Sequence, residues 1–183
     1  MELTKNIINN SKLIKSALFV LIGTALLAIS SKIQTPFTLV PATMQTFVVM
    51  FIGITLGHKL ATLTVLLYLI EGSFGLPVFA KGSGVGYLLG PTGGYLIGFI
   101  FTAFFVGHIN DKKDPLVIFI YLLFSVSIIY ILGLLGLWNY MGFDKNFTEV
   151  FLVGAKPFLL IEIYKILILT VLSKQILKFR KFI

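Results

Sequence analysis

Two charged side chains lie inside one of the most apolar runs of this sequence, KPFLLIEIYKILILTVL. Glu162 and Lys165 are three residues apart, a spacing that puts them on one face of a helix and within reach of each other. A charge near the centre of a bilayer costs about 2.5 to 3.5 kcal/mol on insertion scales, so leucine at either position would be less costly. We interpret the pair as part of a binding site for a small molecule. The alternative is a structural ion pair.

A second feature is the glycine-rich stretch PVFAKGSGVGYLLGPTGGYLIG, which runs from Pro77 to Gly98. Irregular backbone cannot face lipid, because its N–H and C=O groups would lack partners there. We therefore expect this stretch to cover protein or to line a water-accessible cavity. The amides of Gly93 and Gly94 begin a predicted helix, and such an end can receive an anion or a carbonyl oxygen. The alternative is that these glycines only form turns.

Sequence motifs for catalysis are absent from the chain. Gly82, Gly84 and Gly86 have the spacing GxGxG, which does not match the dinucleotide-binding GxGxxG, and no lysine followed by Ser or Thr completes a phosphate-binding P-loop. Neither HExxH nor GxSxG occurs, and without cysteine the chain has no thiolate ligand or nucleophile. We predict no cofactor, no metal and no enzymatic activity. The alternative is an intramembrane enzyme with Glu162 and Lys165 as acid and base.

The composition requires a membrane as solvent for most of the chain. Hydrophobic residues make up 57% of the sequence and charged residues 12%, which is outside the range of soluble domains. We predict an all-α integral membrane protein that forms one domain, a compact bundle of six transmembrane helices with a Gly-rich outer loop. Apolar runs near the roughly 20 residues that cross a bilayer place these helices at about 13–31, 43–57, 59–72, 92–109, 116–138 and 157–176.

The distribution of cations predicts the orientation of the bundle. A net charge of +8 can indicate nucleic-acid binding, but these cations lie between apolar runs, so we interpret them as topology signals and predict no nucleic-acid partner. With six spans, the outer side receives Lys32, Lys81, Lys145 and Lys156, and the other side receives Lys5, Lys12, Lys15, Lys59, Lys112, Lys113, Lys174, Lys178, Arg180 and Lys181. We therefore expect both termini in the cytoplasm and the glycine-rich stretch outside.

Three segments carry a resemblance to a known family. They are VPATMQTFVV from Val40 to Val49, GLPVFAKGSGVGYLLGPTGGYLIGF from Gly75 to Phe99, and KPFLLIEIYK from Lys156 to Lys165. Together they resemble the BioY family, the biotin-specific S components of energy-coupling factor (ECF) vitamin importers. The resemblance covers about residues 15 to 178, and its GPTGGYLIGF and GLPVFA blocks are highly specific.

The resemblance implies an S component in a prokaryotic cytoplasmic membrane, surrounded by lipid, that holds one biotin near the outer face. It also implies three partner subunits, two ATPases and a transmembrane coupling subunit. An acidic residue and a lysine associated with ligand map onto Glu162 and Lys165, although the family usually has aspartate at the first position. The AxxxA docking pattern of the family's first helix has its nearest equivalent at Thr24 and Ala28, with Ala25 adjacent.

The charge balance favours biotin over a cationic vitamin, the alternative being an S component for another small vitamin. Glu162 offset by Lys165, with Lys81 from the outer loop, leaves one positive charge for a carboxylate. Our hypothesis is that Lys165 and Lys81 bind carboxylate or ureido oxygen and that Glu162 accepts a ureido N–H. The remaining expected contacts are walls and hydrogen bonds from Tyr87, Tyr95 and Gln45, and a cover over the ring from Phe79. The alternatives are interfacial anchoring for the two tyrosines and interhelical bonding or helix capping for Gln45.

Overall fold

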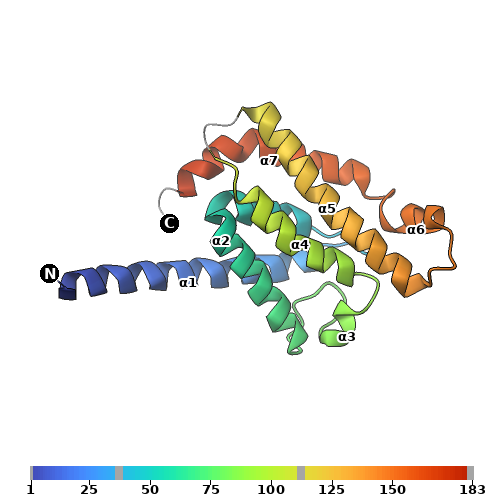
Figure 1. Cartoon of the computed structure of the whole chain (residues 1–183), viewed down its shortest axis with the longest axis horizontal. Coiled ribbons are helices and arrows are strands. Elements are labelled where there is room, and N and C mark those ends of the chain that lie inside the picture. Colours follow the sequence, from blue (N-terminus) through green and yellow to red (C-terminus); the bar gives the residue numbers. More distant parts are fainter. Residues whose placement is uncertain (1, 36–38, 111–113, 181–183) are drawn as a thin grey trace.

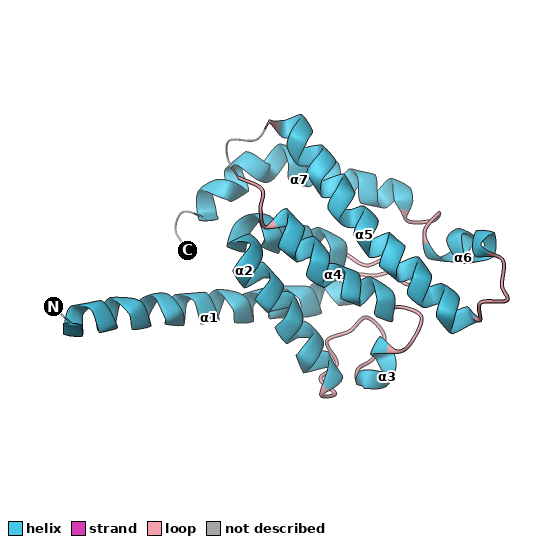
Figure 2. Ribbon diagram, in the orientation of Figure 1, coloured by secondary structure: helices cyan, strands magenta, loops and turns pink. Residues whose placement is uncertain are grey.

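The computed structural model describes residues 2–35, 39–110 and 114–180, with side chains from residue 12 onward. Within these ranges the chain is helical, as the composition predicted, and Gln34 and Thr43 form an isolated β-bridge. Figure 2 shows the helices and the loops that join them. The helices are α1 (Glu2–Lys32), α2 (Gln45–Ser73), α3 (Val85–Leu88), α4 (Gly93–Val106), α5 (Pro115–Met141), α6 (Phe147–Gly154) and α7 (Leu159–Phe179).

The long helix α2 consists of two helical segments that meet at Gly57. The sequence predicts two separate spans here, at about 43–57 and 59–72, and the structure joins them into one helical run with a kink. Gly57 has φ 77°, a conformation that glycine adopts without the steric penalty of a Cβ. The two segments therefore lie at an angle to each other, as Figure 1 shows.

Helices α4 and α5 pack with their backbones in contact. A Cβ built on Gly94 would collide with the carbonyl oxygen of Leu132, and one built on Gly98 would lie 2.7 Å from the Cα of Ile129. Small residues at four-residue spacing allow such an approach, because they leave a smooth strip along one face of the helix. This contact places the buried side chains of α4 beside those of α5.

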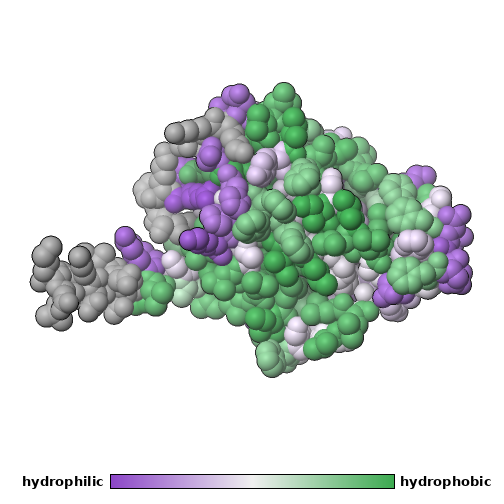
Figure 3. Space-filling model, in the orientation of Figure 1, coloured by the Kyte–Doolittle hydropathy of each residue, from purple (hydrophilic) through white to green (hydrophobic). Residues whose placement is uncertain are grey.

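The molecule has an apolar middle and two more polar ends. Hydrophobic residues cover α4 and α5 in Figure 3, while hydrophilic residues gather near the end of α7 and around the loop between α5 and α6. In the described part of the chain, three helices are long and apolar enough to cross a membrane: Lys12–Lys32 of α1, all of α2, and α5. The start of α1 and the end of α7 lie on the same side of Figure 1, opposite α3 and α6.

Two short helices lie in segments that the sequence analysis leaves as loops. Helix α3 interrupts the glycine-rich stretch, and α6 precedes α7. Asn146 starts α6 as its N-cap, because its side-chain oxygen accepts a hydrogen bond from the amide of Thr148. Segments this short carry too few apolar repeats to be recognised by periodicity.

We expect Gly98→Ala to destabilise the protein by about 1 to 3 kcal/mol, because the added methyl group must push α4 away from α5. Thermal unfolding of the detergent-purified protein measures this as a lower Tm. The matched control is Gly86→Ala, since a Cβ on Gly86 would meet nothing within 4 Å. Equal Tm values for the two variants would contradict the close packing of α4 on α5.

Candidate ligand-binding site

The predicted charged pair forms a buried ion pair on α7. The Nζ atom of Lys165 lies 2.7 Å from Oε1 of Glu162, and these residues are only 4% and 5% exposed. Glu162 stands in the first turn of α7, where a carboxylate also interacts favourably with the positive end of the helix dipole. The spacing of three therefore does place both groups on one face, and that face points into the bundle.

Two threonines complete the surroundings of the pair: Thr43, two residues before α2, and Thr46 in its first turn. Lys165 donates to the carbonyl oxygen of Thr43 at 2.7 Å and to Oγ1 of Thr46 at 2.9 Å. The hydroxyl of Thr46 in turn donates to Oε1 of Glu162 at 2.9 Å. An ammonium group has three N–H donors, and with Glu162 Oε1 as the third acceptor all three of Lys165 are used. Lys165 thus holds Glu162 in place and joins α7 to α2.

The second carboxylate oxygen of Glu162 has a different environment. Oε2 is buried and has no hydrogen-bond partner among the described residues. A buried acceptor without a partner costs about 1 to 3 kcal/mol, and more when it is charged. Glu162 also lines the cavity described next, whereas Lys165 does not. The arrangement therefore offers one unoccupied carboxylate oxygen to a donor from a ligand.

An apolar cavity lies beside Glu162, between the loop before α2, α3, α4, α5 and the start of α7. Its aromatic lining is Tyr87, Tyr95, Phe99, Tyr130 and Phe158. Only about 50 Å³ of its space admits the centre of a water molecule. Apolar and aromatic walls with a few placed polar groups are typical of small-molecule sites. The cavity is narrow, so a ligand of vitamin size must move its walls apart.

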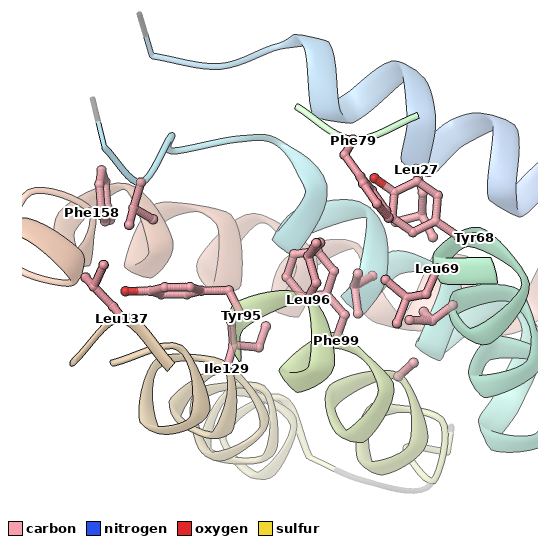
Figure 4. Close-up of a cluster of buried hydrophobic side chains, with 14 of the residues drawn as sticks. Leu27, Tyr68, Leu69, Phe79, Tyr95, Leu96, Phe99, Ile129, Leu137 and Phe158 are labelled. Atoms are coloured by element: carbon pink, nitrogen blue, oxygen red, sulfur yellow. The ribbon is translucent and has the colours of Figure 1, made fainter. Parts of the chain in front are cut away.

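Of the predicted wall residues, Tyr95 and Gln45 line the cavity and also hold the helices together. Tyr95 donates to the carbonyl oxygen of Gly154 at 2.8 Å. In Figure 4 its ring points between Leu137 and Phe158. Gln45 donates to the hydroxyl of Tyr68 at 2.7 Å and accepts from the hydroxyl of Thr43 at 3.1 Å.

The structure separates Phe79 and Lys81 from this cavity. Phe79 is fully buried and stacks on Tyr87 with ring centroids 5.0 Å apart, so it supports Tyr87 from behind. Lys81 lines a neighbouring hollow, which shares Pro41, Tyr87 and Thr92 with the cavity. Tyr87 thus stands between the cavity and the hollow.

The two predicted glycines contact backbone atoms at the start of α4. Gly93 donates its N–H to the carbonyl oxygen of Gly90 at 3.1 Å, and Gly94 faces Leu132 of α5. The residue of this helix start that lines the cavity is Thr92.

The predicted docking residues on α1 face different ways. Thr24 is buried and donates to the carbonyl oxygen of Leu21 at 3.0 Å. Ala25 is exposed and Ala28 is half-buried. Because Thr24 faces the bundle, the three residues do not form one exposed small-residue face.

Sequence reasoning missed Thr43, Thr46 and Tyr130 as site residues. The threonines are three residues apart in the segment VPATMQTFVV, and a pair of hydroxyls before an apolar helix was the available signal. Tyr130 is an aromatic residue in the middle of an apolar helix, and nothing in its neighbourhood distinguishes it from a core residue.

Comparisons with known proteins agree in naming one family. The model of the BioY family matches residues 4–182. The chain is 37% identical over 173 residues to the biotin transporter BioY of Thermotoga maritima, covering 91% of this chain and 96% of that protein. It is 35% identical over 161 residues to a probable biotin transporter BioY of Pyrococcus horikoshii, covering 87% and 92%. A crystal structure of the S component for biotin from an ECF-type ABC transporter matches with a TM-score of 0.79 and 25% identity, covering 92% and 94% of the two chains.

We expect Lys165→Met to lower the stability of the ligand-free protein by about 3 to 5 kcal/mol, because it leaves the Glu162 carboxylate buried without a counterion. The double variant Glu162→Gln with Lys165→Met removes both charges and should recover most of this loss. Thermal unfolding of the three proteins in the same detergent provides the comparison. If Lys165→Met unfolds at the wild-type temperature, the buried pair and the hydrogen bonds of Lys165 do not stabilise the contact of α7 with α2.

Proposed function

This chain belongs to the BioY family, and we propose that it is the biotin-binding S component of an ECF-type importer. The all-helical membrane fold predicted from the sequence is confirmed by the likeness to the solved biotin S component. The observation that carries the proposal is the Oε2 atom of Glu162, a buried carboxylate oxygen without a partner among the described residues, next to an apolar cavity.

Biotin carries hydrogen-bond donors that can pair with Oε2 of Glu162. Its ureido group carries N–H donors, and a charge-assisted hydrogen bond to Oε2 would remove the cost of a buried acceptor. The fused rings are apolar and match the aromatic lining of the cavity. A cationic vitamin would instead have to place its charge beside Lys165, which is held 2.7 Å from Glu162. The lining therefore favours a neutral, apolar ring system with N–H donors.

The hydrogen bonds around Lys165 favour one orientation of biotin. Since its three N–H groups already have acceptors, Lys165 acts on the ligand through Glu162 and has no donor left for a carboxylate. Lys81 lines the hollow on the other side of Tyr87. We infer that the ureido group lies at Glu162 and that the carboxylate of biotin points toward Lys81.

Binding must widen the cavity. The space that now admits a water centre is about 50 Å³, which is too small for a bicyclic ligand. The lining comes from five separate parts of the chain, and Tyr87 belongs to the short helix α3 in the glycine-rich stretch. Movement of α3 with Tyr87 is the least costly way to open the site, because loops are less packed than the helical core.

Transport itself requires partners in this proposal. A P-loop is absent from the sequence, so ATP hydrolysis comes from two ATPase subunits and is transmitted by a membrane coupling subunit. The cations support an orientation with both termini in the cytoplasm of a prokaryotic cell and with α3 and α6 outside. Biotin would enter from the outer side and be released to the cytoplasm.

We expect Glu162→Gln to weaken biotin binding by about 10- to 100-fold, because the amide loses the charge that strengthens the bond to a ureido N–H. The assay is a thermal-shift titration with biotin, thiamin and riboflavin, since a ligand that binds the folded state raises its stability. Glu149→Gln is the matched control, because Glu149 is exposed on α6, and it should bind biotin as the wild type does. Stabilisation by thiamin or riboflavin but not by biotin would overturn the choice of ligand.

We expect Lys81→Gln to weaken the binding of biotin by about 3- to 10-fold and that of biotin methyl ester hardly at all, because only biotin carries the negative charge. The difference should shrink as salt is added. Lys145→Gln, which removes an exposed cation of the outer side, serves as the control. Equal losses for biotin and its ester would place the carboxylate elsewhere while leaving the ureido contact with Glu162 intact.

A further inference from the structure

A second cavity lies at the opposite end of the bundle, where the kink of α2, the end of α4 and the end of α7 meet. It is lined by His58, His108, Asn110 and Arg180, by the backbone at Gly107 and Ile109, and by Leu177. About 340 Å³ of its space admits the centre of a water molecule, so it is far roomier than the cavity beside Glu162. We call it the basic cavity. Figure 3 shows hydrophilic residues gathered at this end of the molecule.

Arg180 is the fixed charge of the basic cavity. Its Nη1 donates to the carbonyl oxygen of Ile109 at 2.8 Å and its Nη2 to that of Gly107 at 2.9 Å. These bonds hold the guanidinium against Gly57, where a Cβ would collide with it. A guanidinium has five N–H donors, so three remain beyond the two bonds to carbonyls. Among the residues that the structure describes, no carboxylate forms an ion pair with Arg180.

The two histidines add further donors beside Arg180. Their rings stack with centroids 4.3 Å apart and planes 16° from parallel. Nδ1 of His108 lies 2.8 Å from the carbonyl oxygen of Phe104, and a carbonyl only accepts, so Nδ1 carries the proton. Lys59 directly follows His58 in the sequence, and Arg180 lines the same cavity. Parallel stacked rings do not converge on a metal ion, and the neighbouring cations repel one, so the cavity selects an anion.

We propose that the basic cavity binds a phosphate group. Arginine presents paired N–H donors that match the oxygens of phosphate, and the bonds to Gly107 and Ile109 hold the guanidinium in one orientation before binding. An anion there would lie beside α2, the segment that follows α4 and the end of α7, and would supply the counterion that Arg180 lacks among the described residues. The ligand class is a phosphate monoester or diester, carried by a phospholipid of the adjacent leaflet or by a soluble molecule.

An exposed apolar face lies beside the basic cavity, where it could contact a phospholipid but not a soluble phosphate. Phe104 is 41% exposed and meets the rings of both His58 and His108 edge-on, with centroids 5.9 and 4.8 Å away. Phe101 and Ile97 continue the exposed apolar face along α4. An acyl chain attached to the phosphate would lie along this face, whereas a soluble phosphate would make no use of it.

The test is a thermal-shift titration of the detergent-purified protein with phosphatidylglycerol, with phosphatidylcholine and with sodium phosphate at constant ionic strength. We expect phosphatidylglycerol or phosphate to raise the Tm, and Arg180→Gln to weaken that binding by about 10-fold or more. His108→Gln should weaken it several-fold and provides the result if Arg180→Gln fails to fold. Lys178→Gln, which removes an exposed cation two residues from Arg180, is the control for net charge.

The outcomes show which source supplies the phosphate and whether the basic cavity binds phosphate at all. A shift with sodium phosphate identifies a soluble ligand, and a shift with phosphatidylglycerol alone identifies a lipid headgroup. The proposal is overturned if neither phosphatidylglycerol nor sodium phosphate shifts the Tm. It is also overturned if Lys178→Gln weakens binding as much as Arg180→Gln and His108→Gln do. A biotin-induced shift retained in every variant shows that the fold and the site beside Glu162 are intact.

Discussion

The ion pair between Glu162 and Lys165 is the interaction on which the arrangement of the site depends. In hydrocarbon a charge must be paired and its hydrogen-bonding groups must be used, because no water is present to replace them. Lys165 meets this demand with three acceptors, two of them from residues 43 and 46. These bonds fix the start of α2 against α7. The same constraint leaves Oε2 of Glu162 buried beside the cavity without a partner among the described residues. In the proposed function, the carboxylate that stabilises the helix contact is also the one that meets the ligand.

Close backbone packing supplies the rigid frame around that carboxylate. Because α4 approaches α5 through Gly94 and Gly98, the aromatic side chains of α4 and α5 can meet in one layer, where Tyr95 and Tyr130 lie edge to face at 6.1 Å. Figure 4 shows Tyr95 of α4 in one buried cluster with Ile129 and Leu137 of α5. The other side of the cavity is formed by short segments of irregular backbone. In the proposed function, the less packed cover moves to admit the ligand while the wall of packed helices stays in place.

Gly57 has two roles in the structure, at the kink of α2 and beside Arg180. Glycine at this position gives the positive φ that the kink needs, and the absence of a Cβ leaves room for the guanidinium of Arg180. Helix α7 carries the ion pair of Glu162 and Lys165 in its first half, and Arg180 directly follows its end. Lys165 donates to the carbonyl of Thr43 and the hydroxyl of Thr46, and Arg180 donates to the carbonyls of Gly107 and Ile109. The bundle is thus fastened across its two polar ends, while its apolar middle packs against itself and faces lipid.

By itself the sequence determined that most of the chain lies in a membrane, where its long helices are, and that Glu162 and Lys165 share one helix face. These features follow from composition and from spacing within a single helix. The family was recognisable from three local segments for the same reason. The tertiary structure decided which partners surround the pair: the carboxylate of Glu162 meets a hydroxyl 116 positions away. It also decided that Phe79 and Lys81 lie outside the cavity and that Thr24 faces inward. Such contacts depend on how separate helices pack and turn, and periodicity within one segment holds no information about them.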